Sequence, residues 1–217
     1  MQYGAELLTY QRSMKLKKEA KKKLLNSKMI LRGLIYFIGS LLISRVILLN
    51  YMAPFGIAAL IDVIIYKEEK MSIVSGVGTL IGYISLYNNV KNLGAYIVVT
   101  GTVTLISYAV RNISRKKQLA LMFIIVLVEI FLYKLLVTKL TIGVSFFTAF
   151  FEVTCIFPIY FIINYSIVCF NDIKTRHLFS NEEVISMAVT SSLVISGTWG
   201  WSLYGIAFRN IFALAFI

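Results

Sequence analysis

Residues 119–138, LALMFIIVLVEIFLYKLLVT, decide the fold of this chain. Only two of these side chains, Glu129 and Lys134, are charged. A run of about 20 apolar residues has the length that an α-helix needs to cross the hydrocarbon core of a bilayer. Inside a bilayer the backbone must satisfy its own hydrogen bonds, and a helix does so within one segment. The stretch is therefore predicted to be a transmembrane helix.

Further apolar runs lie on both sides of this stretch. They cover residues 30–50, 52–66, 71–87, 94–110, 142–169, 184–196 and 203–217. Hydrophobic residues make up 59% of the 217-residue chain and charged residues 15%, whereas soluble domains carry about 45–50% and about 25%. A water-soluble globule is excluded because too few polar side chains are available to cover it. We predict an all-α protein, a polytopic transmembrane bundle of seven or eight helices.

The basic residues indicate how the bundle is oriented. The net charge is +12, and 17 of the 22 Lys and Arg residues fall in four segments, 1–32, 67–70, 111–117 and 171–183. All four lie on one side if the runs cross alternately, so this side is predicted to be the cytoplasm. Residues 1–28 form a basic juxtamembrane segment, for which anionic lipids are the expected partner. Residues 29–217 form the membrane region, and nucleic-acid binding is not expected.

Two carboxylates stand out within the runs. Glu129 and Glu152 each lie about ten residues into an apolar run, and a short link near residues 139–141 would make their helices antiparallel neighbours. At similar depth both could not remain ionised cheaply. They could form a proton or cation site, or they could be neutral acids hydrogen-bonded between helices. We favour the second interpretation, because no substrate motif accompanies them.

Three more ionisable residues lie inside apolar runs, where each is a functional hypothesis. Lys134 is near the outer end of its run and is expected to extend its ammonium group toward the interface. Arg45 lies near the outer end of the first run, and Asp62 near the inner end of the second. This difference in depth argues against a direct pair between Arg45 and Asp62, unless the second segment is tilted or re-entrant.

Two local motifs predict packing and a helix boundary. Gly78 and Gly82 form a GxxxG motif, and such small residues let helices approach closely in lipid. Ser180-Asn-Glu-Glu183 matches a capping box, so a helix should begin near residue 181. The apolar run that follows reaches only about 20 Å at 1.5 Å per residue. It either extends through residues 197–201, which we favour, or dips into the membrane and returns.

Enzymatic chemistry is not expected from these residues. The longest polar stretch has about 28 residues, which is too short for a soluble catalytic domain. His177 is the only histidine, and no nucleotide-binding, hydrolase or metalloprotease motif is present. We predict no catalytic residue, no metal site and no cofactor in this chain.

Several separated stretches resemble the stage II sporulation protein E family of endospore-forming bacteria. They are Met1–Gly4, Arg45–Asn50 followed by Met52–Ala58, Leu178–Met187, and Tyr204–Asn210. The third stretch is similar to a family segment that carries an (S/N)-E-E-x-I-S type of helix start. None of these stretches is a catalytic motif, so the resemblance concerns the membrane region.

The resemblance implies a wider context for the chain. Proteins of this family have a multi-spanning N-terminal membrane region and a central region for self-association and contact with the tubulin-like division ring. Their C-terminal manganese-dependent serine phosphatase of the PP2C type dephosphorylates an anti-anti-sigma factor, which frees the first forespore sigma factor after asymmetric septation. The metal-binding aspartates of that phosphatase are missing here, and manganese is expected only for that absent domain.

We therefore predict the membrane-anchoring region of a sporulation phosphatase, located at the cytoplasmic membrane and the sporulation septum. The last run, 203–217, stops while still apolar, so the chain is expected to be truncated or partial at its C-terminus. By resemblance, the expected partners are further copies of the chain and proteins of the division machinery. The alternatives are a small proton- or cation-coupled transporter that uses Glu129 and Glu152, and an assembly factor that works through the GxxxG face and the basic N-terminus.

Overall fold

The computed structural model describes residues 29–48, 52–66, 69–86, 93–110, 112–172, 179–200, 202–203 and 206–207. The predicted basic segment 1–28 lies outside these residues. The chain divides into one unit of Met1–Ile35 and a second unit of Tyr36–Ile217. In the first unit, residues 29–35 are helical. They begin a first helix, Met29–Ser44, whose residues from Tyr36 onward belong to the second unit.

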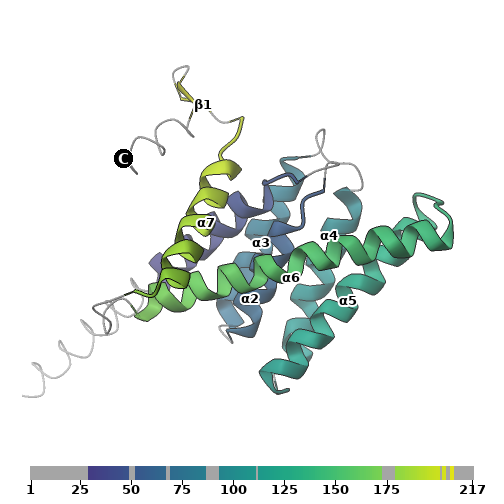
Figure 1. Ribbon diagram of the computed structural model, residues 1–217, viewed down its shortest axis with the longest axis horizontal. Helices are drawn as coiled ribbons and strands as arrows, with labels where there is room; N and C mark the ends of the chain where they lie inside the picture. The colour runs from purple at the N-terminus through teal and green to yellow at the C-terminus, as the bar shows by residue number, and fades with distance from the viewer. Residues whose placement is uncertain are drawn as a thin grey trace, which may run out of the picture. The chain divides into compact units, whose positions relative to one another are not determined.

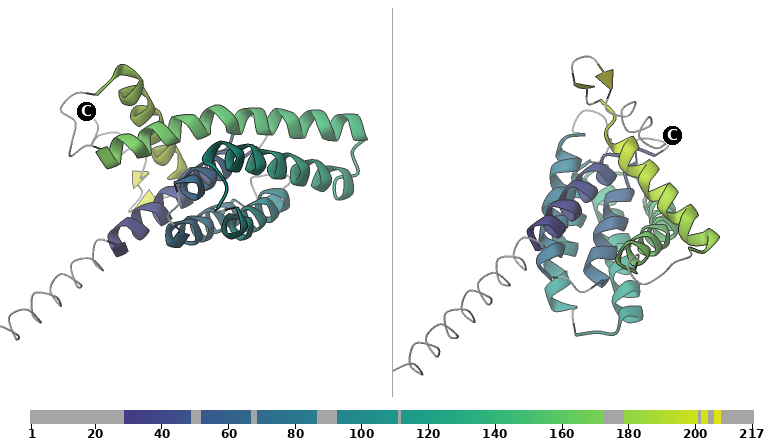
Figure 2. Two further views of the ribbon diagram at one scale, coloured as in Figure 1. Left: turned by 90° about the horizontal axis from the view of Figure 1, so that it is seen from below. Right: turned by 90° about the vertical axis from the view of Figure 1, so that its left-hand side faces the viewer.

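The second unit is built from helices, as predicted. They are α2 (Phe55–Ile65), α3 (Glu69–Ile84), α4 (Leu93–Ala109), α5 (Arg115–Leu136), α6 (Ile142–Asp172) and α7 (Asn181–Gly197). Helices α5 and α6 lie side by side as an antiparallel pair, and α7 packs against the C-terminal part of α6 (Figures 1 and 2). The link between α5 and α6 is short, and Lys139 takes a positive φ of 52° in it. The all-α class is thus confirmed for the described residues, apart from two short strands.

Helix α2 lies at the centre of this unit. All its residues, Phe55–Ile65, are buried, and it packs against α3, α4, α5 and α6. Its 11 residues rise only about 16 Å, about half of the roughly 30 Å hydrocarbon core. Pro54 stands at its N-cap position, where a missing backbone N–H costs nothing. This helix is therefore enclosed by other helices rather than exposed on the surface.

The end of the described chain differs from the prediction. Helix α7 stops at Gly197, and its C-cap residue Thr198 donates its backbone N–H to the carbonyls of Ile195 and Ser196. Extension of the helix through residues 197–201 is therefore wrong. Gly200 has a φ of 83°, a left-handed conformation that ends regular helix and that glycine adopts without strain. Trp201 lies outside the described residues.

A two-stranded antiparallel pair follows α7. Strand β1 (Ser202–Leu203) pairs with β2 (Ile206–Ala207). The run 203–217 was expected to be helical, and at these strand residues the expectation is wrong. The rest of that run is outside the described part of the chain.

Length and composition distinguish two helices from the others. Arg115–Leu136 and Ile142–Cys169 are both long and apolar enough to cross a membrane. The shorter apolar helices are Met29–Ser44, Phe55–Ile65, Met71–Ile84 and Leu93–Ala109. Membrane crossing is thus supported by length and composition for α5 and α6, the two helices that contain the predicted residues Glu129 and Glu152.

The surface of the second unit is apolar, and its interior contains many polar groups. Large exposed hydrophobic side chains occur on α3, α4, α5 and α6, among them Ile73, Val77, Ile81, Leu105, Ile124, Leu136, Phe146, Phe147, Phe150 and Phe151. The buried polar side chains include Ser40, Ser44, Asp62, Ser75, Thr79, Thr100, Gln118, Lys134, Ser145 and Glu152. A soluble protein of this size rarely exposes apolar patches on this scale.

Candidate functional site

The most strongly polar contact in the interior joins α5 to α6. Lys134 Nζ lies 2.6 Å from Glu152 Oε1, and each side chain is only 4% exposed. Extension of the Lys134 ammonium group toward the interface is therefore wrong. Lys134 closes the buried stripe of α5, which consists of Gln118, Met122, Val126, Ile130 and Lys134. This four-residue repeat places Lys134 on the inward face, and the repeat was the sequence signal that could have revealed it.

Glu129 lies on a different face of α5. Its Oε2 accepts a hydrogen bond of 2.6 Å from Thr102 Oγ1 on α4. Glu152 instead contacts Lys134, so the two carboxylates have separate partners on separate helices. The favoured interpretation, acids hydrogen-bonded between helices, fits the contact of Glu129, whereas Glu152 forms an ion pair with Lys134. Helices α5 and α6 are antiparallel neighbours as predicted, but their rotation about their own axes directs the two acids apart.

Asp62 has a partner that the sequence did not single out. Asn164 Nδ2 on α6 donates a 2.5 Å hydrogen bond to Asp62 Oδ1. Asp62 is fully buried, and its second oxygen Oδ2 has no hydrogen-bond partner among the described residues. An amide in the middle of an apolar run was the available signal for Asn164, because an uncompensated polar group there is costly.

Arg45 contacts the segment that follows α7. Its guanidinium donates to the carbonyl oxygen of Trp199 at 3.0 Å, just beyond the end of α7. Asp62 is bonded to Asn164. The two residues therefore contact different parts of the fold, in agreement with the depth difference read from the sequence.

The GxxxG motif of α3 packs against the first helix. A Cβ atom added at Gly78 would lie 2.6 Å from the carbonyl oxygen of Phe37. One added at Gly82 would lie 2.5 Å from the carbonyl oxygen of Leu41 and would overlap Ser44 Oγ. Both distances are too short for a real side chain, so only glycine permits this approach. The predicted use of Gly78 and Gly82 in close helix packing is confirmed.

Hydroxyl groups complete the same interface. Ser40 Oγ and Ser75 Oγ form a buried hydrogen bond of 2.5 Å between the first helix and α3. Thr79 Oγ1 donates back to the carbonyl of Ser75 at 2.9 Å, which satisfies this buried hydroxyl within its own helix. Small side chains and hydroxyls of this kind are the usual components of helix interfaces in lipid.

Tyr83 fixes the start of α2 against α3. Its hydroxyl donates to the carbonyl of Ala53 at 2.8 Å and accepts from the backbone N–H of Ile57 at 3.2 Å. The N–H of Ile57 is one of those that a helix start leaves without an intrahelical partner. Tyr83 thus takes the place of a capping side chain for a helix whose N-cap residue is proline.

The predicted capping box of α7 is present. Glu183 donates its backbone N–H to Ser180 Oγ at 3.2 Å, and Ser180 donates its own N–H to Glu183 Oε2 at 2.9 Å. Two orphan amides of the helix start are satisfied by each other's side chains. This motif caps the start of α7.

The described ranges contain no group of three or more His, Cys, Asp or Glu side chains that could hold a metal ion. The polar contacts instead join neighbouring helices: the first helix with α3, α2 with α6, α4 with α5, and α5 with α6. The arrangement can hold helices together in an apolar environment.

Comparison of the sequence with known families gives a match. The sequence profile of the family described as SpoIIE, N-terminal domain, matches residues 3–217. The chain belongs to this family. The resemblance to stage II sporulation protein E is thereby confirmed over almost the whole sequence. Searches of curated proteins and of solved structures found no match. Because the SpoIIE match is to an N-terminal domain, it assigns no catalytic domain to these residues.

Proposed function

We propose that this SpoIIE N-terminal domain anchors a sporulation serine phosphatase in the cytoplasmic membrane and places it at the asymmetric septum, where the phosphatase acts in sigma-factor activation. The domain itself catalyses nothing. Anionic lipids, further copies of the chain and proteins of the division machinery are its proposed partners. Family membership supports the link to sporulation, and the distribution of polar and apolar side chains supports the membrane role.

That distribution is the observation that carries the proposal. As whole residues, Phe147 and Leu105 are 72% exposed, while Lys134 and Glu152 are 3% exposed. Water would favour the opposite arrangement, because exposed apolar area costs about 25 cal/mol per Å². Lipid tails impose no such cost, and they favour polar groups that are satisfied between helices. The arrangement therefore suits a polytopic bundle in a bilayer.

The interhelix contacts support alternate crossing of the membrane by the helices. If the helices cross alternately, Arg45 and Trp199 are both at the outer side, and their contact agrees with this. Asp62 and Asn164 both fall toward the inner side and are also in contact. The basic first turn of α5, Arg115–Lys117, then lies at the cytoplasmic surface, as the positive-inside rule requires.

The transporter alternative has less support. Transport through Glu129 and Glu152 would need carboxylates that exchange a proton or cation along one path. Glu152 is bound to Lys134, and Glu129 to Thr102 on another helix. Reconstituted vesicles separate the two proposals, because Glu129→Gln or Glu152→Gln should abolish proton flux only if the chain is a transporter.

Localisation and topology test the anchor proposal directly. A fluorescent protein fused after Ile217 should give a membrane-bound signal that concentrates at the septum of a sporulating endospore former. Sodium carbonate should leave the fusion in the membrane fraction. A signal that is soluble, or uniform around the cell during septation, would contradict the proposal. A fusion carrying residues 1–28 alone serves as the control for binding by the basic segment.

A further inference from the structure

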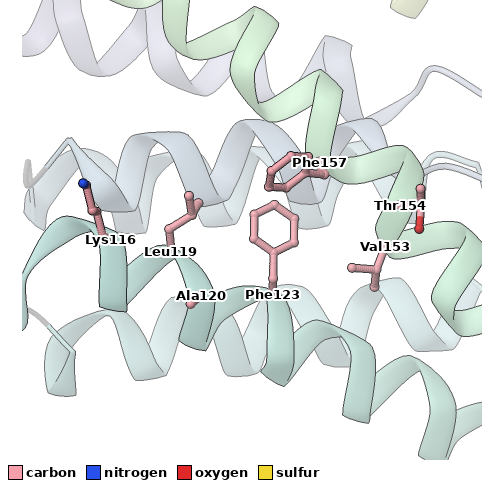
Figure 3. Close-up of a pocket in the computed structure, with 7 residues that line it drawn as sticks. All are labelled: Lys116, Leu119, Ala120, Phe123, Val153, Thr154 and Phe157. Atoms are coloured by element: carbon pink, nitrogen blue, oxygen red, sulfur yellow. The ribbon is translucent and has the colours of Figure 1, made fainter.

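A groove on the outside of the α5–α6 pair has one charged end. It has a volume of about 410 Å³ and is lined by Lys116, Leu119, Ala120, Phe123, Val153, Thr154 and Phe157. The rings of Phe123 and Phe157 lie next to each other in its lining (Figure 3), with centroids 5.4 Å apart and planes tilted by 60°. Thr154 Oγ1 donates to the carbonyl of Phe150 in its own helix. With that proton engaged, Lys116 is the lining side chain that can still donate a hydrogen bond to a ligand.

Positive charge is concentrated at that end. Arg115, Lys116 and Lys117 are consecutive and exposed, and they form the first turn of α5. This turn has no acidic residue, and the N-cap Ser114 makes no side-chain hydrogen bond to it. The amino end of a helix carries a partial positive charge and unsatisfied N–H groups. Three cations there repel one another and the helix end, so an anion is the complementary occupant.

The remainder of the groove requires an apolar occupant. Phe123 lies seven residues beyond Lys116, about 10 Å along the helix axis. A ligand that contacts both Lys116 and Phe123 must carry an anionic group and a hydrocarbon chain that reaches about 10 Å deeper along the helix. We propose that this groove binds an anionic phospholipid of the cytoplasmic leaflet, with its phosphate on Lys116 and an acyl chain against Phe123 and Phe157.

This inference rests on the proposed membrane orientation, which puts the first turn of α5 at the level of the cytoplasmic headgroups. That leaflet is rich in anionic lipid. A free phosphate ion would use the cations but not the aromatic walls, and a neutral lipid would use the walls but not the cations. The combination of both features in one groove selects a lipid with a negative headgroup.

Native mass spectrometry of the full chain in detergent micelles tests the proposal, with phosphatidylglycerol and phosphatidylcholine as the probes. The wild-type chain should retain phosphatidylglycerol in preference to phosphatidylcholine. Lys116→Gln should weaken retention of phosphatidylglycerol about fivefold, the effect expected for one basic residue at an anionic membrane surface. Ala120→Phe should weaken retention of both lipids, because the new ring fills the groove.

Matched controls lie on the same helix pair. Lys139→Gln removes an exposed lysine at the opposite end, and Leu132→Phe adds a ring at an exposed apolar position outside the groove. Both should retain the wild-type preference. Equal retention of the two lipids by the wild-type chain would overturn the proposal, as would an unchanged preference in Lys116→Gln. If Ala120→Phe abolished a dimer and left the lipid preference unchanged, the groove would instead be assigned to a second copy of the chain.

Flotation of the wild-type chain with liposomes is measured separately. A chain that does not float with phosphatidylcholine liposomes would contradict the anchor proposal itself. A chain that floats but shows no preference for phosphatidylglycerol would contradict only the lipid site. The thermal stability of each variant in micelles shows whether a loss of lipid reflects unfolding.

Discussion

The first helix meets α3 through small residues, whereas α5 meets α6 through large aromatic residues and a buried ion pair. At the first interface, backbone atoms approach so closely that Gly78 and Gly82 leave no room for a methyl group. At the second, Lys134 and Glu152 are joined at 2.6 Å, and Phe131 packs edge-on against Phe146. One interface depends on the absence of side chains and the other on their presence.

The difference shows what each interface can tolerate. Dispersion contacts between close backbones are many and individually weak, so added volume is harmful and the loss of one hydroxyl is minor. A buried ion pair concentrates its effect in two groups, and the loss of either leaves an uncompensated charge. The predictions below run from the largest expected effect to the smallest.

The ion pair should give the largest effect. Glu152→Leu leaves Lys134 buried without its partner and should lower the free energy of unfolding by about 3–5 kcal/mol. The double variant Lys134→Met/Glu152→Leu removes both charges and should recover most of that loss. Unfolding in mixed detergent micelles measures both. Equal losses in the single and double variants would show that the charges do not depend on each other.

Added volume at the close interface should come next. Gly82→Ala places a methyl group against Leu41 and Ser44 and should cost about 1–3 kcal/mol, the usual range for overpacking. Gly101→Ala is the matched control, because a Cβ at Gly101 meets nothing within 4 Å. The control should be neutral or slightly stabilising, since alanine favours helix over glycine. Equal effects at both positions would refute close packing at Gly82.

A substitution outside both interfaces gives a reference value with which the effects at the two interfaces can be compared. Ser180→Ala removes the hydroxyl that accepts from the Glu183 backbone N–H and should cost about 1 kcal/mol. Ser192→Ala on the same helix removes a hydroxyl that donates only to the Val189 carbonyl and should change stability by less than about 0.5 kcal/mol. Amide hydrogen exchange should show faster exchange confined to the first turn of α7 in Ser180→Ala alone.

The smallest effect should come from the hydroxyl pair at the close interface. Ser40→Ala and Ser75→Ala, combined in a double-mutant cycle, should give a coupling energy of about 0.6 kcal/mol, the average for hydrogen bonds between membrane helices. Thermal unfolding of the two single variants and the double variant provides the cycle. A coupling near that of the Lys134–Glu152 pair would remove the contrast between the two interfaces.

Features governed by local sequence could be predicted. The apolar runs predicted the helices because their length and continuity are set within one segment. The GxxxG motif and the capping box were also correct, since Gly78 and Gly82 differ by one helical turn and Ser180 and Glu183 lie within another. These signals need no knowledge of which helix lies next to which.

Contacts between distant segments could not be predicted in the same way. Partners such as Asn164 for Asp62, or Thr102 for Glu129, depend on how each helix rotates about its axis, and depth alone does not determine rotation. Lys134 was misjudged because its distance from the end of the run was considered without its position on the buried stripe. The end of α7 was misjudged because the short apolar run favoured extension through residues 197–201, while Gly200 allows the chain to turn.

The enclosed helix α2 has a consequence for how such a protein is made. Its 11 residues are too few to be held by lipid on their own, and they include Asp62. Yet α2 leaves the ribosome before α3, α4, α5 and α6, which form its surroundings in the finished fold. If each helix entered the bilayer as soon as it was made, α2 would lie in lipid without the helices that enclose it. The segment must instead wait at the insertion machinery, or near the surface, until the later helices can enclose it.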